Sequence, residues 1–185
     1  MRTFIAIEMD KAVVEKLEAI RHRLQKADAD VKWVEPENSH LTIKFIGEID
    51  PAKVDAIKAE MQQAAVTVKP FELAVHTAGS FPKGRPPRVL WVGVHDASGS
   101  LARLHAELEN GLAKLGIEPE GREFAGHLTL GRVRSRKNVR KLAEMLAAEN
   151  PAELGSSHVD GLTLFESKLD ARGPKYTALA HIQLG

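Results

Sequence analysis

Two histidine–threonine pairs are the side chains of this sequence best suited to chemistry. His40-Leu41-Thr42-Ile43 and His127-Leu128-Thr129-Leu130 are nearly identical tetrapeptides in a chain of 185 residues. With 8 histidines in the chain, a His-x-Thr triplet should arise by chance less than once. A single triplet on a strand is usually surface decoration, whereas two copies in matching context favour a functional site.

The spacing of each pair predicts a shared face. In a strand, side chains two residues apart point the same way, so His40 lies with Thr42 and His127 with Thr129. We expect the intervening residues, and Phe45 further along the first strand, to point to the opposite face. Two imidazoles can divide proton transfer, one as acid and one as base, and threonine hydroxyls can donate to phosphate oxygens. Such a site needs no metal and no covalent intermediate.

Other chemical motifs in the sequence are weaker. The segment 79–86 has the glycine spacing of a phosphate loop, but Arg85 and Pro86 replace its lysine and hydroxyl residue. His95-Asp96 resembles the central pair of a metal-dependent phosphohydrolase site, yet a turn or helix cap is the better interpretation. The chain has no Cys and no Gly-x-Ser-x-Gly motif, which excludes thiol chemistry and gives no support to a serine hydrolase.

The two motifs lie within alternating strands and amphipathic helices. The hydrophobic pattern predicts strands over residues 3–8, 31–34, 40–46, 71–78, 88–94, 127–133, 159–165 and 176–184. Helices are predicted after Asp10, after Asp50-Pro51, over 101–115 and over 138–149. No linker or strict βαβ repeat interrupts this pattern. We therefore expect one α+β domain over 1–185, with mainly antiparallel sheets and helices packed outside.

The charge is unevenly distributed along the chain. The 26 basic and 25 acidic residues nearly balance, but segments 81–91 and 132–141 contain nine basic residues and no acid. These segments could present a local positive field to an anionic ligand, although a solvated loop and helix start explain them equally well. The sequence also lacks a secretory pattern and an apolar run long enough to span a membrane, so we expect a cytoplasmic protein.

At these residues the sequence resembles the 2H phosphoesterases, which are named for two His-x-Thr/Ser-x motifs. Within them it is similar to the bacterial and archaeal RNA 2′,3′-cyclic phosphodiesterases, historically called 2′-5′ RNA ligases. The likeness covers nearly the whole chain and includes segments 2–7, 31–34, 37–47, 87–94, 127–133, 164–167 and 173–176. One departure is Ala171, where proline is expected, and it lies outside both motifs.

The resemblance implies two similar lobes whose antiparallel sheets line a central groove, with one motif in each. The implied reaction opens an RNA terminal 2′,3′-cyclic phosphate to a 2′-phosphomonoester without a cofactor. It casts His40 as proton donor, His127 as proton acceptor, and Thr42 and Thr129 as phosphate-binding residues. The implied partner is RNA with a cyclic phosphate end, for which tRNA is one source. Neither a membrane nor an obligate protein partner is implied, and reversible 2′-5′ ligation would be the same chemistry run backwards.

Two alternatives stay open from the sequence. The enzyme could act on another small cyclic or 2′-5′-linked nucleotide, or the domain could bind RNA without catalysis. A binding module usually interleaves aromatic platforms with basic residues, and aromatics are only 5% of this chain. The contexts of the two histidines are nearly symmetric, so their roles as acid and base follow from the resemblance alone.

Overall fold

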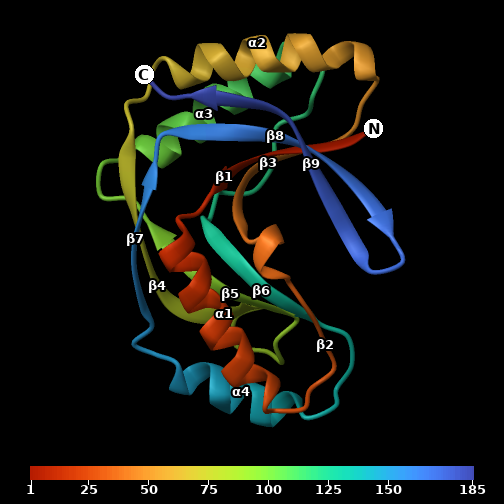
Figure 1. Ribbon diagram of the computed structural model, residues 1–185, viewed down its shortest axis with the longest axis vertical. Helices are drawn as coiled ribbons and strands as arrows, with labels where there is room; N and C mark the ends of the chain where they lie inside the picture. Colours follow the sequence, from red (N-terminus) through yellow and green to blue (C-terminus); the bar gives the residue numbers. More distant parts are fainter.

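The computed structural model describes all residues from 1 to 185 and confirms the α+β class (Figure 1). The chain forms two antiparallel sheets and four α-helices. Sheet A has the strand order β3 (His40–Glu48), β1 (Arg2–Glu8), β8 (Gly161–Asp170) and β9 (Gly173–Gln183). Sheet B has the order β2 (Val31–Trp33), β6 (His127–Val133), β5 (Val89–His95), β4 (Phe71–Phe81) and β7 (Glu153–Val159). The first motif begins β3 and the second begins β6.

The four helices bury the apolar stripes that the sequence predicts. They are α1 (Lys11–Gln25), α2 (Val54–Ala65), α3 (Ser100–Ala113) and α4 (Val139–Ala148), with 3₁₀ turns at Pro36–Asn38 and Pro51–Lys53. On α1 the buried apolar side chains recur at helical spacing, as Val13, Leu17, Ile20 and Leu24. The start of the second helical segment is capped, because the Asp50 carboxylate accepts a hydrogen bond of 2.9 Å from the Ala52 amide.

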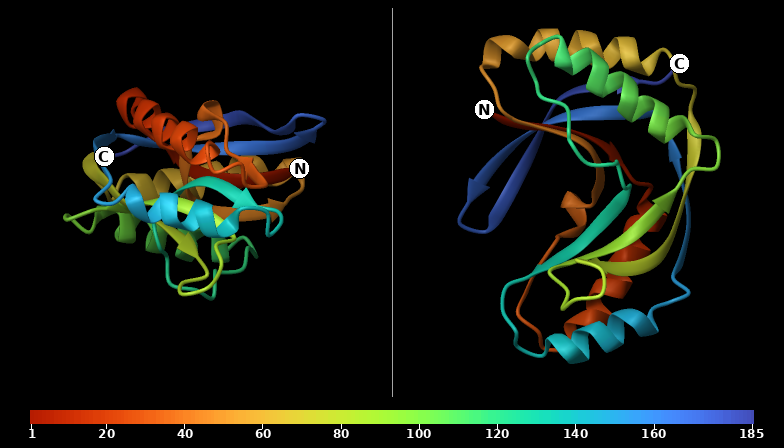
Figure 2. Two further views of the ribbon diagram at one scale, coloured as in Figure 1. Left: turned by 90° about the horizontal axis from the view of Figure 1, so that it is seen from below. Right: turned by 180° about the vertical axis from the view of Figure 1, so that it is seen from behind.

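Two helices, α1 and α3, pack against the sheet to which the strand before them does not belong. Helix α1 follows β1 of sheet A but packs against β7 of sheet B and against α4. Helix α3 follows β5 of sheet B but packs against β3 of sheet A and against α2. The view from behind shows α2 and α3 together over sheet A and α4 at the far end beside α1 (Figure 2). Each layer therefore depends on both halves of the sequence.

A single apolar cluster fills the space between sheets and helices. It contains 38 buried residues and draws on both sheets, for example Ile5 and Leu41 from sheet A and Leu73 and Leu128 from sheet B. A second cluster is small and aromatic, with Phe4, Ala6 and Phe165 buried and Tyr176 packed against them. The small cluster lies beside the first motif.

The C-terminal third corrects one predicted boundary. The sequence pattern predicts a single strand over 159–165, whereas the chain forms β7 up to Val159 and β8 from Gly161. Strand β7 was missed because its sequence, Glu-Leu-Gly-Ser-Ser-His-Val, is poor in strand-forming residues. Asp160 lies between the two strands, at the point where the chain passes from sheet B to sheet A.

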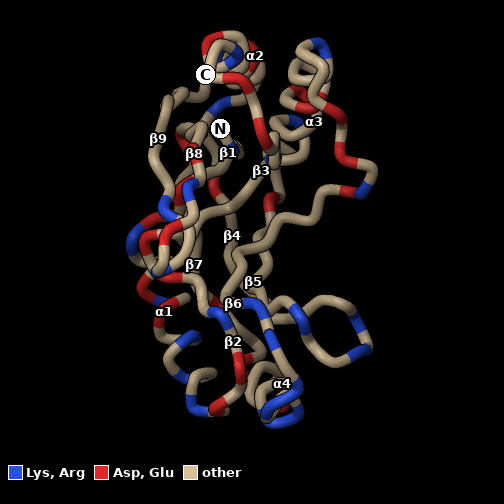
Figure 3. The backbone as a smooth tube through the Cα atoms, turned by 90° about the vertical axis from the view of Figure 1, so that its right-hand side faces the viewer, with Lys and Arg blue, Asp and Glu red and all other residues tan.

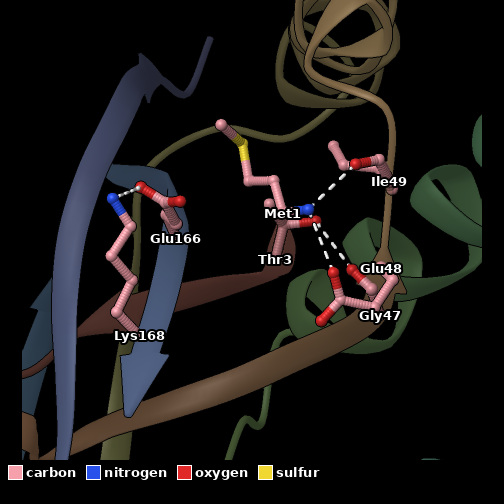
Figure 4. Close-up of polar contacts among 7 residues, drawn as sticks. All are labelled: Met1, Thr3, Gly47, Glu48, Ile49, Glu166 and Lys168. Atoms are coloured by element: carbon pink, nitrogen blue, oxygen red, sulfur yellow. Dashed lines mark hydrogen bonds and ion pairs between the residues drawn. The ribbon is translucent and has the colours of Figure 1, made fainter. Parts of the chain in front are cut away.

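Short polar contacts tie the strands of sheet A together at their ends (Figure 4). The Met1 ammonium donates to Glu48 at 3.0 Å and to the Ile49 carbonyl at 3.1 Å, and the Thr3 hydroxyl donates to the Gly47 carbonyl at 3.4 Å. These contacts hold the start of β1 against the end of β3, the strand with the first motif. No helix of the structure is both long enough and apolar enough to cross a membrane.

Candidate active site

Both motifs show the predicted alternation of faces. Along each strand the histidine and threonine are half-buried, while the residues between and after them are buried in the core. The buried residues are Leu41 and Ile43 in the first motif and Leu128 and Leu130 in the second. Strands β3 and β6 also contact one another, although they belong to different sheets. The fold thus brings the two motifs onto neighbouring strands.

The strands that carry the motifs have matching neighbours. His40 and Thr42 pair with Glu8 and Ala6 of β1, and His127 and Thr129 pair with Gly93 and Trp91 of β5. In both strands the register then shifts, leaving Ile43 unpaired in one case and Leu130 in the other. The shift is a β-bulge, in which an extra residue bends the strand and re-aims the side chains that follow.

The bulge overturns the prediction for Phe45. Ile43 and Lys44 both point away from the motif face, so Phe45 returns to the face that carries His40 and Thr42. Its ring centroid is 6.0 Å from that of Phe4, and it is 56% exposed. Strict alternation predicted the opposite face, because sequence alone gives no sign of the extra residue. The equivalent position in the second motif is Arg132, which is exposed.

Aromatic rings surround the His40 imidazole on sheet A. It stacks on Phe4 and Phe165 with centroid distances of 5.1 and 5.6 Å, and meets Tyr176 edge-on at 5.2 Å. Ala6, the strand neighbour of Thr42, is small and fully buried among them. Burial in this apolar setting disfavours the charged imidazolium and lowers the pKa of His40 to about 4. His40 is therefore neutral at pH 7 in the free protein.

His127 has a different environment on sheet B. Its Nδ1 lies 2.8 Å from the Ala125 carbonyl, which can only accept, so Nδ1 bears the proton of this hydrogen bond. The neutral ring then keeps its lone pair on Nε2. Phe81 meets the imidazole edge-on at 5.3 Å and is itself 38% exposed. Nε2 is the atom left for proton transfer.

Tyr176 lies against His40 of the first motif and near Arg132, which follows the second motif. Burial is the main cause that raises the pKa of its phenol, while the positive charges of Arg132 and Arg2 lower it in part. The phenol therefore remains a neutral donor at pH 7, with Arg132 close enough for its charge to be felt. The sequence predicted no site role for Phe4, Phe165 or Tyr176, and it included Arg132 only as part of the basic segment 132–141. Their gathering depends on strand register, and Arg132 reaches the motif face only because of the bulge at Leu130.

The basic segments differ in how free their charges are. Within 132–141, Arg134 pairs with Asp30 at 3.5 Å, Lys137 with Asp28 at 3.2 Å, and Arg140 with Glu144 at 3.2 Å. The loop between β4 and β5 has three exposed cations, Lys83, Arg85 and Arg88, and no acid. It projects from sheet B with its basic residues apart from acidic ones (Figure 3). Acidic partners therefore oppose part of the positive field predicted for 132–141.

The weaker motifs have structural roles. Gly79 lies in β4, where a Cβ atom would come within 2.5 Å of the Trp91 ring, so the glycine serves packing. Asp96 caps α3, since its carboxylate accepts from the amides of Leu101 at 2.7 Å and Ser98 at 2.9 Å. This confirms the interpretation of His95-Asp96 as a turn and helix cap. No group of three or more His, Asp or Glu side chains is arranged to hold a metal ion.

Comparison with known sequences finds similarity over the whole chain. A family model described as LigT-like phosphoesterase matches twice, over residues 7–91 and 92–176, so each match contains one motif. An RNA 2′,3′-cyclic phosphodiesterase of Methanothermobacter thermautotrophicus is 36% identical over 184 residues, covering 100% of this chain and 99% of that protein. One of Archaeoglobus fulgidus is 36% identical over 179 residues, covering 97% and 98%.

Solved structures agree with these sequence relatives. A crystal structure of a Thermus thermophilus protein has a TM-score of 0.83 and 26% identity, covering 100% of this chain and 98% of the other. A crystal structure of E. coli LigT complexed with 3′-AMP has a TM-score of 0.75 and 26% identity, covering 99% and 97%. The similarity thus extends over both sheets and both motifs.

Proposed function

The chain belongs to the LigT-like phosphoesterase family, and on that premise we propose that it hydrolyses RNA terminal 2′,3′-cyclic phosphates to 2′-phosphomonoesters. The observation that carries the proposal is the pair of His-x-Thr motifs on adjacent strands with matching register and matching bulges. The curated relatives named above bear that activity in their names, which supports the same substrate class for this chain.

The proposed reaction is an acid–base displacement at phosphorus. Water attacks the phosphorus atom and gives its proton to Nε2 of His127. The bond from phosphorus to the 3′-oxygen breaks, and His40 protonates that oxygen, leaving a 2′-phosphate and a 3′-hydroxyl. Thr42 and Thr129 donate hydrogen bonds to the non-bridging oxygens as charge develops on them. With an RNA 5′-hydroxyl in place of water as the nucleophile, the same steps would form a 2′-5′ linkage.

The environment of His127 supports its role as the base, and the environment of His40 sets a condition for its role as the acid. The Ala125 carbonyl fixes the His127 tautomer with its lone pair on Nε2, as a base requires. His40 is neutral in the free protein and needs a proton before it can act as an acid. An anionic phosphodiester beside the ring favours the imidazolium and raises its pKa, so substrate binding supplies the condition for protonation.

The experiment is a substrate comparison in EDTA. We expect turnover of an RNA oligonucleotide with a 2′,3′-cyclic phosphate end, because the two imidazoles supply both proton transfers. ³¹P NMR should identify a 2′-phosphomonoester as the product. Binding without turnover would favour a non-catalytic RNA-binding module. Faster turnover of a cyclic mononucleotide or a 2′-5′-linked dinucleotide than of the oligonucleotide would favour a small-nucleotide enzyme. Complete loss of activity in EDTA, restored by a divalent ion, would contradict the two-histidine mechanism.

A further inference from the structure

Lys44 is a buried cation for which the proposed chemistry has no use. It lies two residues after Thr42, yet its side chain is only 1% exposed. The bulge at Ile43 directs it away from the motif face and toward α3. A buried ammonium group is costly unless it is paired and hydrogen-bonded, so its partners are informative.

The partners of Lys44 lie at the end of α3 and in the connection that follows it. Its Nζ is 2.9 Å from Oε1 and 3.2 Å from Oε2 of Glu109, and it donates to the Glu118 carbonyl at 2.8 Å. The Glu109 carboxylate also accepts from the Glu120 amide at 3.2 Å. One ion pair therefore holds two backbone groups of the segment 114–126, which joins α3 to β6.

The far end of this segment is fixed as well. Phe124 stacks on His105 of α3, with ring centroids 4.5 Å apart and an interplanar angle of 14°. The Val94 amide donates to the Gly126 carbonyl at 3.2 Å. Ala125 lies between these two contacts, so its carbonyl is held by packing on one side and by a strand hydrogen bond on the other.

The Ala125 carbonyl is the group that orients His127. It accepts the Nδ1 proton at 2.8 Å and thereby leaves Nε2 free as a base. Loosening of the segment 114–126 would displace this carbonyl and release the tautomer. A shift of about 1 Å in a catalytic group can cost about 100-fold in rate.

We propose that Lys44 is a positioning residue for His127. Through Glu109 and the Glu118 carbonyl it ties the strand of the first motif to the segment that aims the second histidine. The two halves of the active site are then set relative to each other by a buried ion pair that contacts neither the substrate nor the reacting atoms. The kinetic consequence rests on the proposed function, whereas the structural one does not.

A double variant separates positioning from stability. Lys44→Met alone removes the ammonium partner of the Glu109 carboxylate and leaves His105 Nε2, at 3.5 Å, as its nearest basic group, so we expect a destabilised protein. Lys44→Met/Glu109→Leu removes both charges at similar volume, so its Tm should be close to that of the wild type. It cannot hold the Glu118 carbonyl or the Glu120 amide, and its kcat should fall about 10–100-fold with KM unchanged. Lys58→Met, which breaks an exposed pair with Asp55 on α2, is the matched control and should leave kcat unchanged.

A second measurement needs no substrate. ¹⁵N NMR of the imidazole of His127 should find the Nδ1-protonated tautomer in the wild type and a mixture in the folded double variant. An unchanged tautomer in that variant would overturn the proposal, whatever happens to kcat. A folded double variant with wild-type kcat would overturn it too. If the wild type turns over no cyclic-phosphate RNA, the proposed function fails, while the tautomer comparison still decides the role of Lys44.

Discussion

His40, the proposed proton donor, lies in an aromatic environment. The rings of Phe4, Phe165 and Tyr176 exclude water from the imidazole and lower its pKa to about 4, against an ordinary value of about 6.5. Below its pKa the free protein carries a charged ring in an apolar site, and above it the ring is neutral. Binding of an anion adds an attractive charge, so the pKa must rise in the complex. The enzyme would therefore take up a proton when its substrate binds.

This shift should be visible in the pH dependence of catalysis. In kcat/KM, which reports the free enzyme, we expect an acidic limb near pH 4, whichever proton transfer His40 performs. In kcat, which reports the complex, the limb of His40 should lie at higher pH because the bound phosphodiester raises the pKa. Rates between pH 3.5 and 8, with circular dichroism at each pH as a control for folding, test this. Coincident acidic limbs near 6.5 in both parameters would contradict the pKa of His40 and its cause.

Thr42 and Thr129 each offer one hydroxyl on the motif face. We expect Thr42→Ala and Thr129→Ala to keep measurable activity, because each loses one hydrogen bond to a phosphate oxygen. The expected cost is about 1–3 kcal/mol, which is about 5–160-fold in kcat/KM. Thr→Ser variants keep the hydroxyl and are the matched controls. Wild-type rates in both alanine variants would remove the threonines from the site.

Regular elements were predictable because their apolar residues repeat locally. The strand His127–Val133 and the buried stripe of α1 follow directly from hydrophobic spacing. The bulges at Ile43 and Leu130 could not be predicted, because an extra residue is a property of strand pairing rather than of composition. They decide that Lys44 points inward and that Phe45 and Arg132 share the face of the motif histidines and threonines. The aromatic surroundings of His40 also escaped prediction, since Phe4 and Phe165 meet only through the pairing of β1 with β8.

The loop between β4 and β5 gives a test at the level of one element. Neutralising Lys83, Arg85 and Arg88 together should raise KM for a long RNA, because exposed cations gain affinity by releasing counterions from phosphates. The slope of log affinity against log salt should fall by up to about 2, at about 0.7 per phosphate contact on a single strand. KM for a cyclic mononucleotide should not change.

The matched control for the loop variant is neutralisation of Lys137 and Arg140, which already have acidic partners at 3.2 Å. We expect a much smaller change in KM and in the salt slope for that pair. Equal effects of the two sets of substitutions would show that the loop has no special part in holding RNA.

The two halves of the molecule are interlocked. Each sheet takes strands from both halves of the sequence. Helices α1 and α3 each pack against the sheet to which the preceding strand does not belong, and one apolar cluster reaches both sheets. The family model nevertheless matches once in each half, so the sequence repeat and the packing units do not coincide. The proposed active site at the contact between β3 and β6 therefore depends on the whole chain.

This interlocking predicts a single unfolding transition. Both tryptophans, Trp33 and Trp91, lie in sheet B, whereas circular dichroism reports on both sheets. We expect the urea midpoints from tryptophan fluorescence and from circular dichroism to coincide, because each sheet packs against a helix that follows a strand of the other sheet. Two separated midpoints would mean that the sheets unfold independently and that the shared core is not the source of stability.

The central claim, that two imidazoles carry the proton transfers, is tested most directly by removing them. Wild-type, His40→Ala, His127→Ala and double-variant proteins would be compared on an RNA oligonucleotide ending in a 2′,3′-cyclic phosphate, in EDTA. Each single variant should lose at least about 100-fold in rate, and the double variant little more than either, because the two groups act as a unit. Circular dichroism should stay native, since Leu41, Ile43, Leu128 and Leu130 still anchor the strands. A well-folded His40→Ala or His127→Ala protein that keeps more than about a tenth of the wild-type rate would contradict the two-histidine mechanism.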